Sequence, residues 1–342
     1  SIKNIGVGFT PGVTNAYGMY LSRATADSAN LTSQPRSDSI SVLGNVVDNV
    51  PTWECYDTHG GSAITFDSNV GTNCYYGISV GPSNNSAGVS TYSSKNVALN
   101  GFSLSSISSA GASGAGIVFQ GAQGAEYSTG SVTGGVLSNF GDQTNGTQGT
   151  AVLLNQTIGL NITGLSINKP SPTCILANTN NDALVISGVT CTDPWTNDAG
   201  IGEVDAISGK GAGNNMTIVG NNFRHIGIVA TYTLTSTNSS AIRLAAAANG
   251  SLFVGDNNTN ATTYLNNGGI SANYGSFTLN GATAVTVANT FVRESSSFKF
   301  GIQSPSGTVG TYPNIKAKVN GTSFDVFGTA GDVSTYTYEI SQ

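Results

Sequence analysis

The chain has 342 residues and a mass of 34.7 kDa, with 9% charged residues and a formal net charge of −6. This balance excludes the basic surface of a nucleic-acid-binding protein, and no run of about 18 apolar residues is present that could insert into a membrane. The chain contains few Lys, Glu and Arg residues but 45 glycines. Such a composition favours strands and tight turns over helices.

A short phrase recurs along most of the sequence: an apolar residue, any residue, a second apolar residue, and then glycine or another turn residue. Copies start at residues 40, 64, 97, 160, 184, 216, 252 and 277. Spacings of about 24 to 36 residues are in the range of solenoid repeats. An apolar residue at every second position is typical of a short strand that buries one face.

A second phrase, in which glycine or alanine precedes two alternating apolar residues, lies between copies of the first. It starts at residues 18, 77, 116, 151, 241 and 269. Two or three such strands, joined by turns, make one coil, and stacked coils align their inward apolar residues in columns. The sequence therefore predicts an all-β fold, a right-handed parallel β-helix or solenoid, with a small C-terminal β cap.

Asparagines follow the turn residue in several copies, at Asn45, Asn69, Asn221 and Asn257. Asn tolerates the positive φ of a tight turn, so we expect these residues to adopt it. Stacked in successive coils, their side chains would also bond the backbone of the neighbouring coil, as in an asparagine ladder.

The repeated phrases are no longer recognisable after Gly307, so we expect a β-helix over residues 1–307 and a C-terminal β cap over 308–342. Outward positions carry apolar residues such as Val118, Leu153 and Leu176. An exposed apolar stripe of this length needs a cover, so these residues and the cap predict a parallel homotrimer. The chain begins at Ser1 without an initiator Met, and we expect an upstream segment that has been removed.

The four cysteines are too few for a disulfide scaffold and lack a CxxC pair, so we expect four buried thiols and no zinc site. They are Cys55, Cys74, Cys174 and Cys191. We expect neither a cofactor nor an essential metal, because the sequence has no His/Cys cluster and no Asp-rich calcium repeat.

Residues 53–61, Trp-Glu-Cys-Tyr-Asp-Thr-His-Gly-Gly, form the most unusual segment. The repeat aligns residues 53–57 with residues 76–80 of the next coil, which turns Glu54 and Tyr56 outward and Asp57 inward near the strand end. His59 then lies in the turn. An acid, a phenol and an imidazole at one corner can transfer protons, whereas the alternative is a hydrogen-bonded structural turn.

A second acidic group lies in residues 193–205, where Glu203 and Asp205 share one strand face. Paired carboxylates are typical of glycoside hydrolysis, and Trp195 offers a face for a sugar ring. The alternative is a capped surface loop with ion pairs on a solvated face. Further candidate substrate contacts in and around this group are Asp193, Arg224, His225 and Arg243.

Residues 53–61, followed by Ile-Thr-Phe-Asp-Ser-Asn at 64–69, resemble the pectate-lyase-type β-helices of bacteriophage tailspikes. The resemblance implies a homotrimer, attachment to the phage tail by an upstream domain, and action on capsule or O-antigen polysaccharide at the host surface. The string Tyr-Asp-Thr-His at 56–59 is also similar to the Asp-Pro-His motif of alginate C5-epimerases, with Thr58 in place of proline. That similarity makes Asp57 and His59 candidates for proton chemistry.

We therefore expect a tailspike-type, receptor-binding polysaccharide depolymerase located in the virion tail, most readily a hydrolase using Glu203 and Asp205. Glu54 and Tyr56 join the expected substrate contacts. One alternative is a non-catalytic polysaccharide-binding adhesin. The other is a uronan lyase or epimerase acting through Asp57 and His59, against which the total of 12 Lys and Arg residues weighs.

Overall fold

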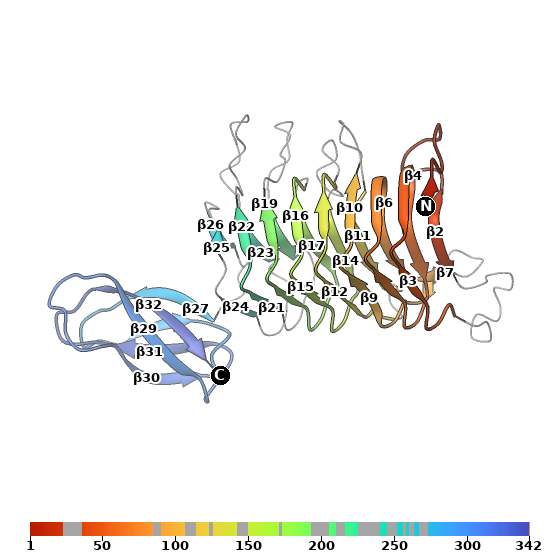
Figure 1. Ribbon diagram of the computed structural model, residues 1–342. Helices are drawn as coiled ribbons and strands as arrows, with labels where there is room; N and C mark the ends of the chain where they lie inside the picture. Colours follow the sequence, from red (N-terminus) through yellow and green to blue (C-terminus); the bar gives the residue numbers. More distant parts are fainter. Residues whose placement is uncertain are drawn as a thin grey trace.

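The computed structural model describes most of the chain, and all its regular elements there are strands, β1 to β32 (Figure 1). No helix in this part of the chain is long and apolar enough to cross a membrane. The described residues are 1–22, 36–84, 90–106, 114–122, 126–141, 150–170, 173–192, 205–209, 216–224, 240–244, 252–255, 258–259, 263–266 and 273–341.

Parallel strands stack coil upon coil into a right-handed β-helix with three faces, which confirms the predicted fold. The first face is an 8-stranded sheet that contains the copies of the first sequence phrase. Its strands are β3 (Ser41–Leu43), β5 (Thr65–Asp67), β9 (Val97–Asn100), β12 (Gly130–Thr133), β15 (Asn161–Thr163), β18 (Val185–Ser187), β21 (Met216–Val219) and β24 (Leu252–Gly255).

The second and third faces are two arms of one 16-stranded sheet. The second face consists of β10 (Ser103–Ser106), β13 (Val136–Ser138), β16 (Ser166–Asn168), β19 (Thr190–Thr192), β22 (Asn222–Arg224) and β25 (Asn258–Thr259). The third face consists of β11 (Ile117–Gln120), β14 (Thr150–Asn155), β17 (Thr173–Thr179), β20 (Asp205–Gly209), β23 (Ser240–Leu244) and β26 (Thr263–Asn266).

The first coils differ because two long strands, β4 (Val46–His59) and β6 (Val70–Gly81), pass along both arms and join them. Short β1 (Ile2–Lys3) pairs with the start of β4, and β2 (Tyr17–Ser22) pairs with its end. A hairpin of β7 (Ser83–Asn84) and β8 (Ser90–Tyr92) follows β6. The third face therefore begins with β2, β4 and β6 in that order.

One column of inward side chains runs along the first face and shows how the repeat builds the core. Its members pair in register from coil to coil and are almost completely buried, as expected for a period-2 strand pattern. They are Val42, Phe66, Leu99, Val132, Ile162, Ile186 and Ile218.

The asparagine ladder is present, but the positive φ lies one residue earlier than predicted. Gly44, Ser68 and Gly220 have φ of 62°, 54° and 63°, whereas the asparagines after them do not adopt this conformation. Asn69 is buried, accepts a hydrogen bond from the backbone N–H of Asn45 at 2.9 Å and donates one to the carbonyl of Val42 at 2.8 Å. Asn221 repeats this arrangement, and Asn257 lies outside the described residues.

The cysteines form two disulfides, Cys55–Cys74 and Cys174–Cys191, so the prediction of free thiols is wrong. Each disulfide joins the third face of one coil to the second face of the next. Their Cα atoms lie 5.6 and 6.4 Å apart. Stacking of coils creates this proximity, which a search for closely spaced cysteine pairs does not detect.

The C-terminal unit is a pair of three-stranded antiparallel sheets, and it begins earlier than the predicted boundary after residue 307. Residues 274–304 pair with the last strands of the chain, so the phrase at residue 277 belongs to this unit and not to a coil. One sheet is β27 (Tyr274–Thr278), β32 (Thr335–Ser341) and β29 (Ser297–Ser304); the other is β28 (Val285–Ala288), β31 (Ser323–Phe327) and β30 (Asn314–Val319).

The outward apolar residues of the third face do not form the exposed stripe that was predicted. Val118 and Leu176 lie between inward neighbours in β11 and β17, yet each is only 7% exposed in the single chain, and Leu153 in β14 is half-buried. Because Val118 and Leu176 are already buried in the single chain, their burial does not require a trimer. Large exposed apolar residues lie elsewhere: Phe9 and Val13 near the start of the chain at 62% and 73%, Leu43 on the first face at 60%, and in the C-terminal unit Tyr312 at 70% and Val319 at 52%.

Candidate active site

The candidate site lies on the third face at the end of β4, where a local irregularity sets which side chains point outward. The pairing of β4 with β6 shifts between Val50 and Glu54, so Glu54 lies beside Tyr76 and Asp57 beside Ser79. The predicted alignment is therefore wrong by one residue. Because a one-residue slip exchanges the two faces of a strand, the orientations of two candidate residues change.

Tyr56 was expected to face outward as a substrate contact, but it lies in the core. Its ring is completely buried against Phe66, and its hydroxyl lies 2.9 and 2.8 Å from the carbonyl oxygens of Asn45 and Val70. Asp57, expected at an inward register, is on the outer side of the coil with Glu54 and His59. Tyr56 therefore stabilises the coil and cannot reach a polysaccharide.

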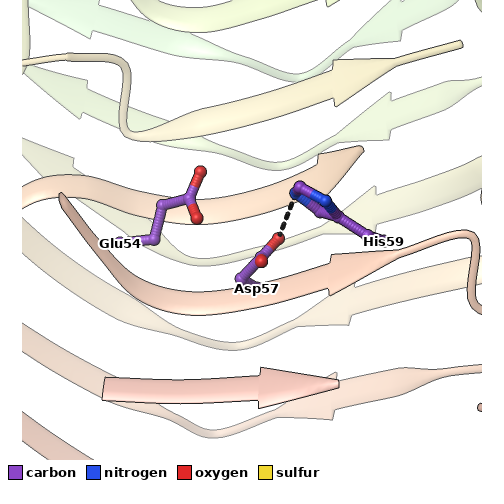
Figure 2. A group of neighbouring side chains, drawn as sticks. All are labelled: Glu54, Asp57 and His59. Atoms are coloured by element: carbon purple, nitrogen blue, oxygen red, sulfur yellow. Dashed lines mark ion pairs between the residues drawn. The ribbon is translucent and has the colours of Figure 1, made fainter. Parts of the chain in front are cut away.

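Glu54, Asp57 and His59 gather on this outer face, with one oxygen or nitrogen from each lying within 4.8 Å of the others (Figure 2). Nε2 of His59 is 3.2 Å from Oδ1 of Asp57. The exposed fraction is 6% for Glu54 and 0% for Asp57, whereas 28% of the His59 side chain is exposed. The imidazole is thus the member of the cluster that solvent and a bound polymer can reach.

Tyrosines on the neighbouring strands enclose the cluster. Tyr17 and Tyr20 of β2 pair with Glu54 and Asp57, and their rings stack at 4.5 Å between centroids. Tyr20 also meets the edge of His59 at 5.7 Å and is 44% exposed. The surface around His59 therefore has the aromatic character that favours contact with a sugar ring.

Gly81 provides the space for the His59 ring. It pairs with His59 across β4 and β6, and a Cβ placed on Gly81 would lie 3.0 Å from the imidazole Cδ2 and Nε2 atoms. The imidazole ring therefore packs against the backbone of Gly81, with no side chain between them. A larger residue here would push the ring away from Asp57.

Burial changes the ionisation of the two carboxyl groups. It raises the pKa of Glu54 to about 9, an effect reinforced by the charge of Asp57 and opposed by hydrogen bonds from Ser79 and Trp53. Burial also raises the pKa of Asp57, against the favourable contact with His59. Tyr20 likewise has a raised pKa because of burial, so its phenol stays protonated. The site therefore combines proton donors with an imidazole that can accept a proton.

Most of the second predicted cluster lies outside the residues that the structure describes. Glu203, Asp193, Trp195 and His225 lie outside them. Asp205 opens β20 and pairs with Ser240, whereas Arg243 pairs with Ser208 three residues further along that strand pair. Asp205 and Arg243 are thus not directly opposite each other. Arg224 ends β22 on the second face, away from the face that carries Arg243.

Sequence reasoning found the residues of the site but missed part of its surroundings. The copy of the second phrase at residues 17–21 was recognised, yet Tyr17 and Tyr20 were not connected with the segment at 53–61. Aligning the two copies in register would have placed both tyrosines beside Glu54 and Asp57. The sequence predicted no essential metal because it has no His/Cys cluster; the structure brings together one imidazole and two carboxyl groups, those of His59, Glu54 and Asp57.

Residues 271–341 match the family model for the K1 capsule-specific polysaccharide lyase, C-terminal domain. The match covers the antiparallel C-terminal unit and leaves the coils outside it. It confirms the resemblance to tailspike-type capsule depolymerases that the sequence predicted. Comparison with curated protein sequences gives no significant match.

Solved structures with some likeness include an alginate lyase from Paenibacillus sp. str. FPU-7, at 12% identity and a TM-score of 0.42, covering 73% of this chain and 98% of that one. The tailspike of Pseudomonas phage phi297 has 12% identity and a TM-score of 0.31, with coverage of 89% and 62%. A tailspike of E. coli bacteriophage HK620, in complex with a pentasaccharide, has 13% identity and a TM-score of 0.28, with coverage of 92% and 76%. At these values the likeness carries no functional argument.

Proposed function

We propose that this protein depolymerises an acidic bacterial surface polysaccharide at the Glu54–Asp57–His59 site. The observation that carries the proposal is the partly exposed imidazole of His59 held 3.2 Å from the fully buried carboxylate of Asp57. A carboxylate that holds one ring nitrogen fixes the tautomer and orientation of a general base. The base here faces a tyrosine-rich surface suited to sugars.

The geometry favours elimination over the hydrolysis that the sequence first suggested. Hydrolysis uses two carboxyl groups about 5 to 9.5 Å apart with a sugar or a water between them. Glu54 and Asp57 are both buried, so neither presents an exposed carboxyl group to a sugar or a water between them. The reachable group is the imidazole, and the family matched by the C-terminal unit is described as a polysaccharide lyase.

The elimination step requires a uronic acid residue, whose carboxyl group acidifies the proton on C5. His59 Nδ1 takes this proton, and the electron pair of the broken bond forms the double bond between C4 and C5. The bond from C4 to the glycosidic oxygen breaks, and the oxygen leaves with a proton from the Tyr20 hydroxyl. Solvent then returns a proton to Tyr20 and removes one from His59, which regenerates the site.

The test is a continuous ultraviolet assay for the unsaturated product on purified capsule polysaccharides. His59→Gln should lower turnover by about a hundredfold or more, and Tyr20→Phe by about the same order, as for the loss of an acid–base group. Gly81→Ala should lower kcat with little change in KM, because it displaces the imidazole. Asp67→Asn, at the end of β5 on the first face, is the acidic control and should keep full activity.

Three results would count against this assignment. New reducing ends without ultraviolet absorbance would identify a hydrolase. A normal rate in His59→Gln with a dead Glu203→Gln or Asp205→Asn variant would move the site to the later coils. Tight binding of polysaccharide without any product would identify the non-catalytic adhesin that the sequence leaves as an alternative.

The biological setting is part of the same proposal. The resemblance to tailspike-type capsule depolymerases supports a receptor-binding homotrimer that acts outside the host cell as part of a virion tail. Attachment to the tail would use a domain upstream of the coils. The exposed apolar residues of the C-terminal unit, rather than the third face, are the surface that supports trimer formation.

A further inference from the structure

We propose that Glu54, Asp57 and His59 also form a binding site for one divalent transition-metal ion, and that this ion switches off the base of the proposed reaction. The binding part stands on the geometry of the cluster alone. The inhibitory part rests on the proposed function. The three ligands all lie on β4, after the shift in its pairing with β6.

The geometry supplies a set of donor atoms that converge on one point. One atom from each of the three side chains lies within 4.8 Å of the others (Figure 2). Oε2 of Glu54 and Oδ2 of Asp57 are buried and have no hydrogen-bond partner among the described residues, whereas Oδ1 of Asp57 faces Nε2 of His59 at 3.2 Å. Glu54 is 94% buried, so the cluster has unused ligand capacity inside the protein.

The charges of the two carboxyl groups also favour a cation at this site. An ionised carboxylate is only an acceptor, so two neighbouring carboxylates cannot bond to each other without a proton or a cation between them. Four ion pairs occur among the described residues, and the one with His59 is the only one that reaches this cluster. No described Lys or Arg neutralises Glu54 or Asp57. A proton on one of the two carboxyl groups meets this requirement in the metal-free site, and a cation that enters beside the exposed edge of His59 would take its place.

The ligand types select the class of metal. Imidazole nitrogen with carboxylate oxygens suits zinc, iron and related first-row ions, whereas Ca²⁺ and Mg²⁺ prefer oxygen ligands throughout. Three protein ligands with further positions facing outward resemble the ligand number of an open zinc site. We therefore expect Zn²⁺ to bind most tightly, Mn²⁺ more weakly, and Ca²⁺ and Mg²⁺ least.

The imidazole tautomer explains why the ion would block elimination. While Nε2–H faces Asp57, the lone pair is on Nδ1 and can accept the C5 proton. A metal ion bound to Nε2 needs the lone pair of that nitrogen, so Nε2 loses its proton and the ring proton resides on Nδ1. In this state Nδ1 is a donor and no longer a base. Proton abstraction and metal binding at His59 therefore exclude each other.

Calorimetric titration of the chelator-treated chain with Zn²⁺ tests binding without any substrate. We expect one ion per chain at this site and a higher melting temperature with Zn²⁺. Asp57→Asn and Glu54→Gln should each weaken this binding by about tenfold to a hundredfold or more, while Asp67→Asn leaves it unchanged. His59→Gln, at a partly exposed position, provides a variant whose folding is least at risk. Equal Zn²⁺ binding in all four variants would overturn the site.

Activity measurements then separate this inference from the proposed function. Zn²⁺ should inhibit the ultraviolet assay over the concentration range in which it binds, and chelator should restore the rate. Activity lost with chelator and restored by Zn²⁺ would overturn the inhibitory role. Zn²⁺ binding to a chain that never produces unsaturated sugar would disprove the proposed function and leave the binding site intact. Activity without any Zn²⁺ binding would do the reverse.

Discussion

The stacked coils and the C-terminal unit are both built of strands, but they bury their apolar residues in different ways. In the coils, each strand pairs in parallel with the equivalent strand of the next coil, and a single core cluster extends along them. In the C-terminal unit, strands pair antiparallel around a second core rich in Phe and Tyr. The two sets of buried residues have no member in common.

This difference shows which part of an all-β chain can be recognised from a repeat. A coil repeats the same inward positions, so its pattern recurs in the sequence. The C-terminal unit uses each strand once, in a pairing that joins distant segments such as β27 and β32. Apolar and polar residues alternate in both arrangements, so alternation cannot distinguish them. For this reason the boundary between the coils and the C-terminal unit was predicted too far along the chain.

The largest effect is expected from removing one large ring in each core. Phe66 and Phe324 are both completely buried, and replacing either with Ala should cost about 3–5 kcal/mol. Because the two cores are separate, Phe66→Ala should lower only the coil transition and Phe324→Ala only that of the C-terminal unit. Differential scanning calorimetry checks this. A single transition that both variants lower equally would show that the two regions unfold together.

A smaller effect is expected from opening the first disulfide, which exists only in the coils. Cys55 and Cys74 are 19 residues apart, and closing a loop of this size stabilises by about 3 kcal/mol. The double variant Cys55→Ala/Cys74→Ala should lower the denaturant midpoint of the coils and leave the C-terminal unit unchanged.

The matching control replaces Cys174 and Cys191, which should affect the coils to a similar extent. Because Cys55 is next to Glu54, only the first disulfide variant should also lower depolymerase activity. An equal loss of activity in both variants would indicate a general loosening of the coils.

The smallest effect on folding is expected at the exposed apolar residues of the C-terminal unit. Tyr312→Asp and Val319→Asp should leave both thermal transitions in place, because these side chains are mostly exposed in the single chain. If the unit makes the trimer contacts, the mass from light scattering should fall from three times 34.7 kDa to the monomer value. Unchanged mass in both variants, or a monomer before substitution, would contradict a trimer built through this surface.

The fold was largely predictable, because each coil has an apolar residue at the same inward position of the repeated phrase, as in Phe66 and Ile162. The candidate site was only partly predictable. Glu54, Asp57 and His59 were singled out by their chemistry, but the orientation of Asp57 depends on the shift between Val50 and Glu54, which no period reveals. The disulfides were missed for a related reason, since stacking of coils, not spacing, brings the thiols together.

The register shift in β4 has a consequence for how solenoids change over evolutionary time. Between Val50 and Glu54, β4 has two more residues than β6 has between their partners Cys74 and Tyr76, and the parallel pairing resumes after them. The additional residues lie where β4 passes from the second face to the third, so the ladders on either side stay intact. A repeat protein can thus accept a short insertion beside a reactive face without any change in the repeats that hold it together.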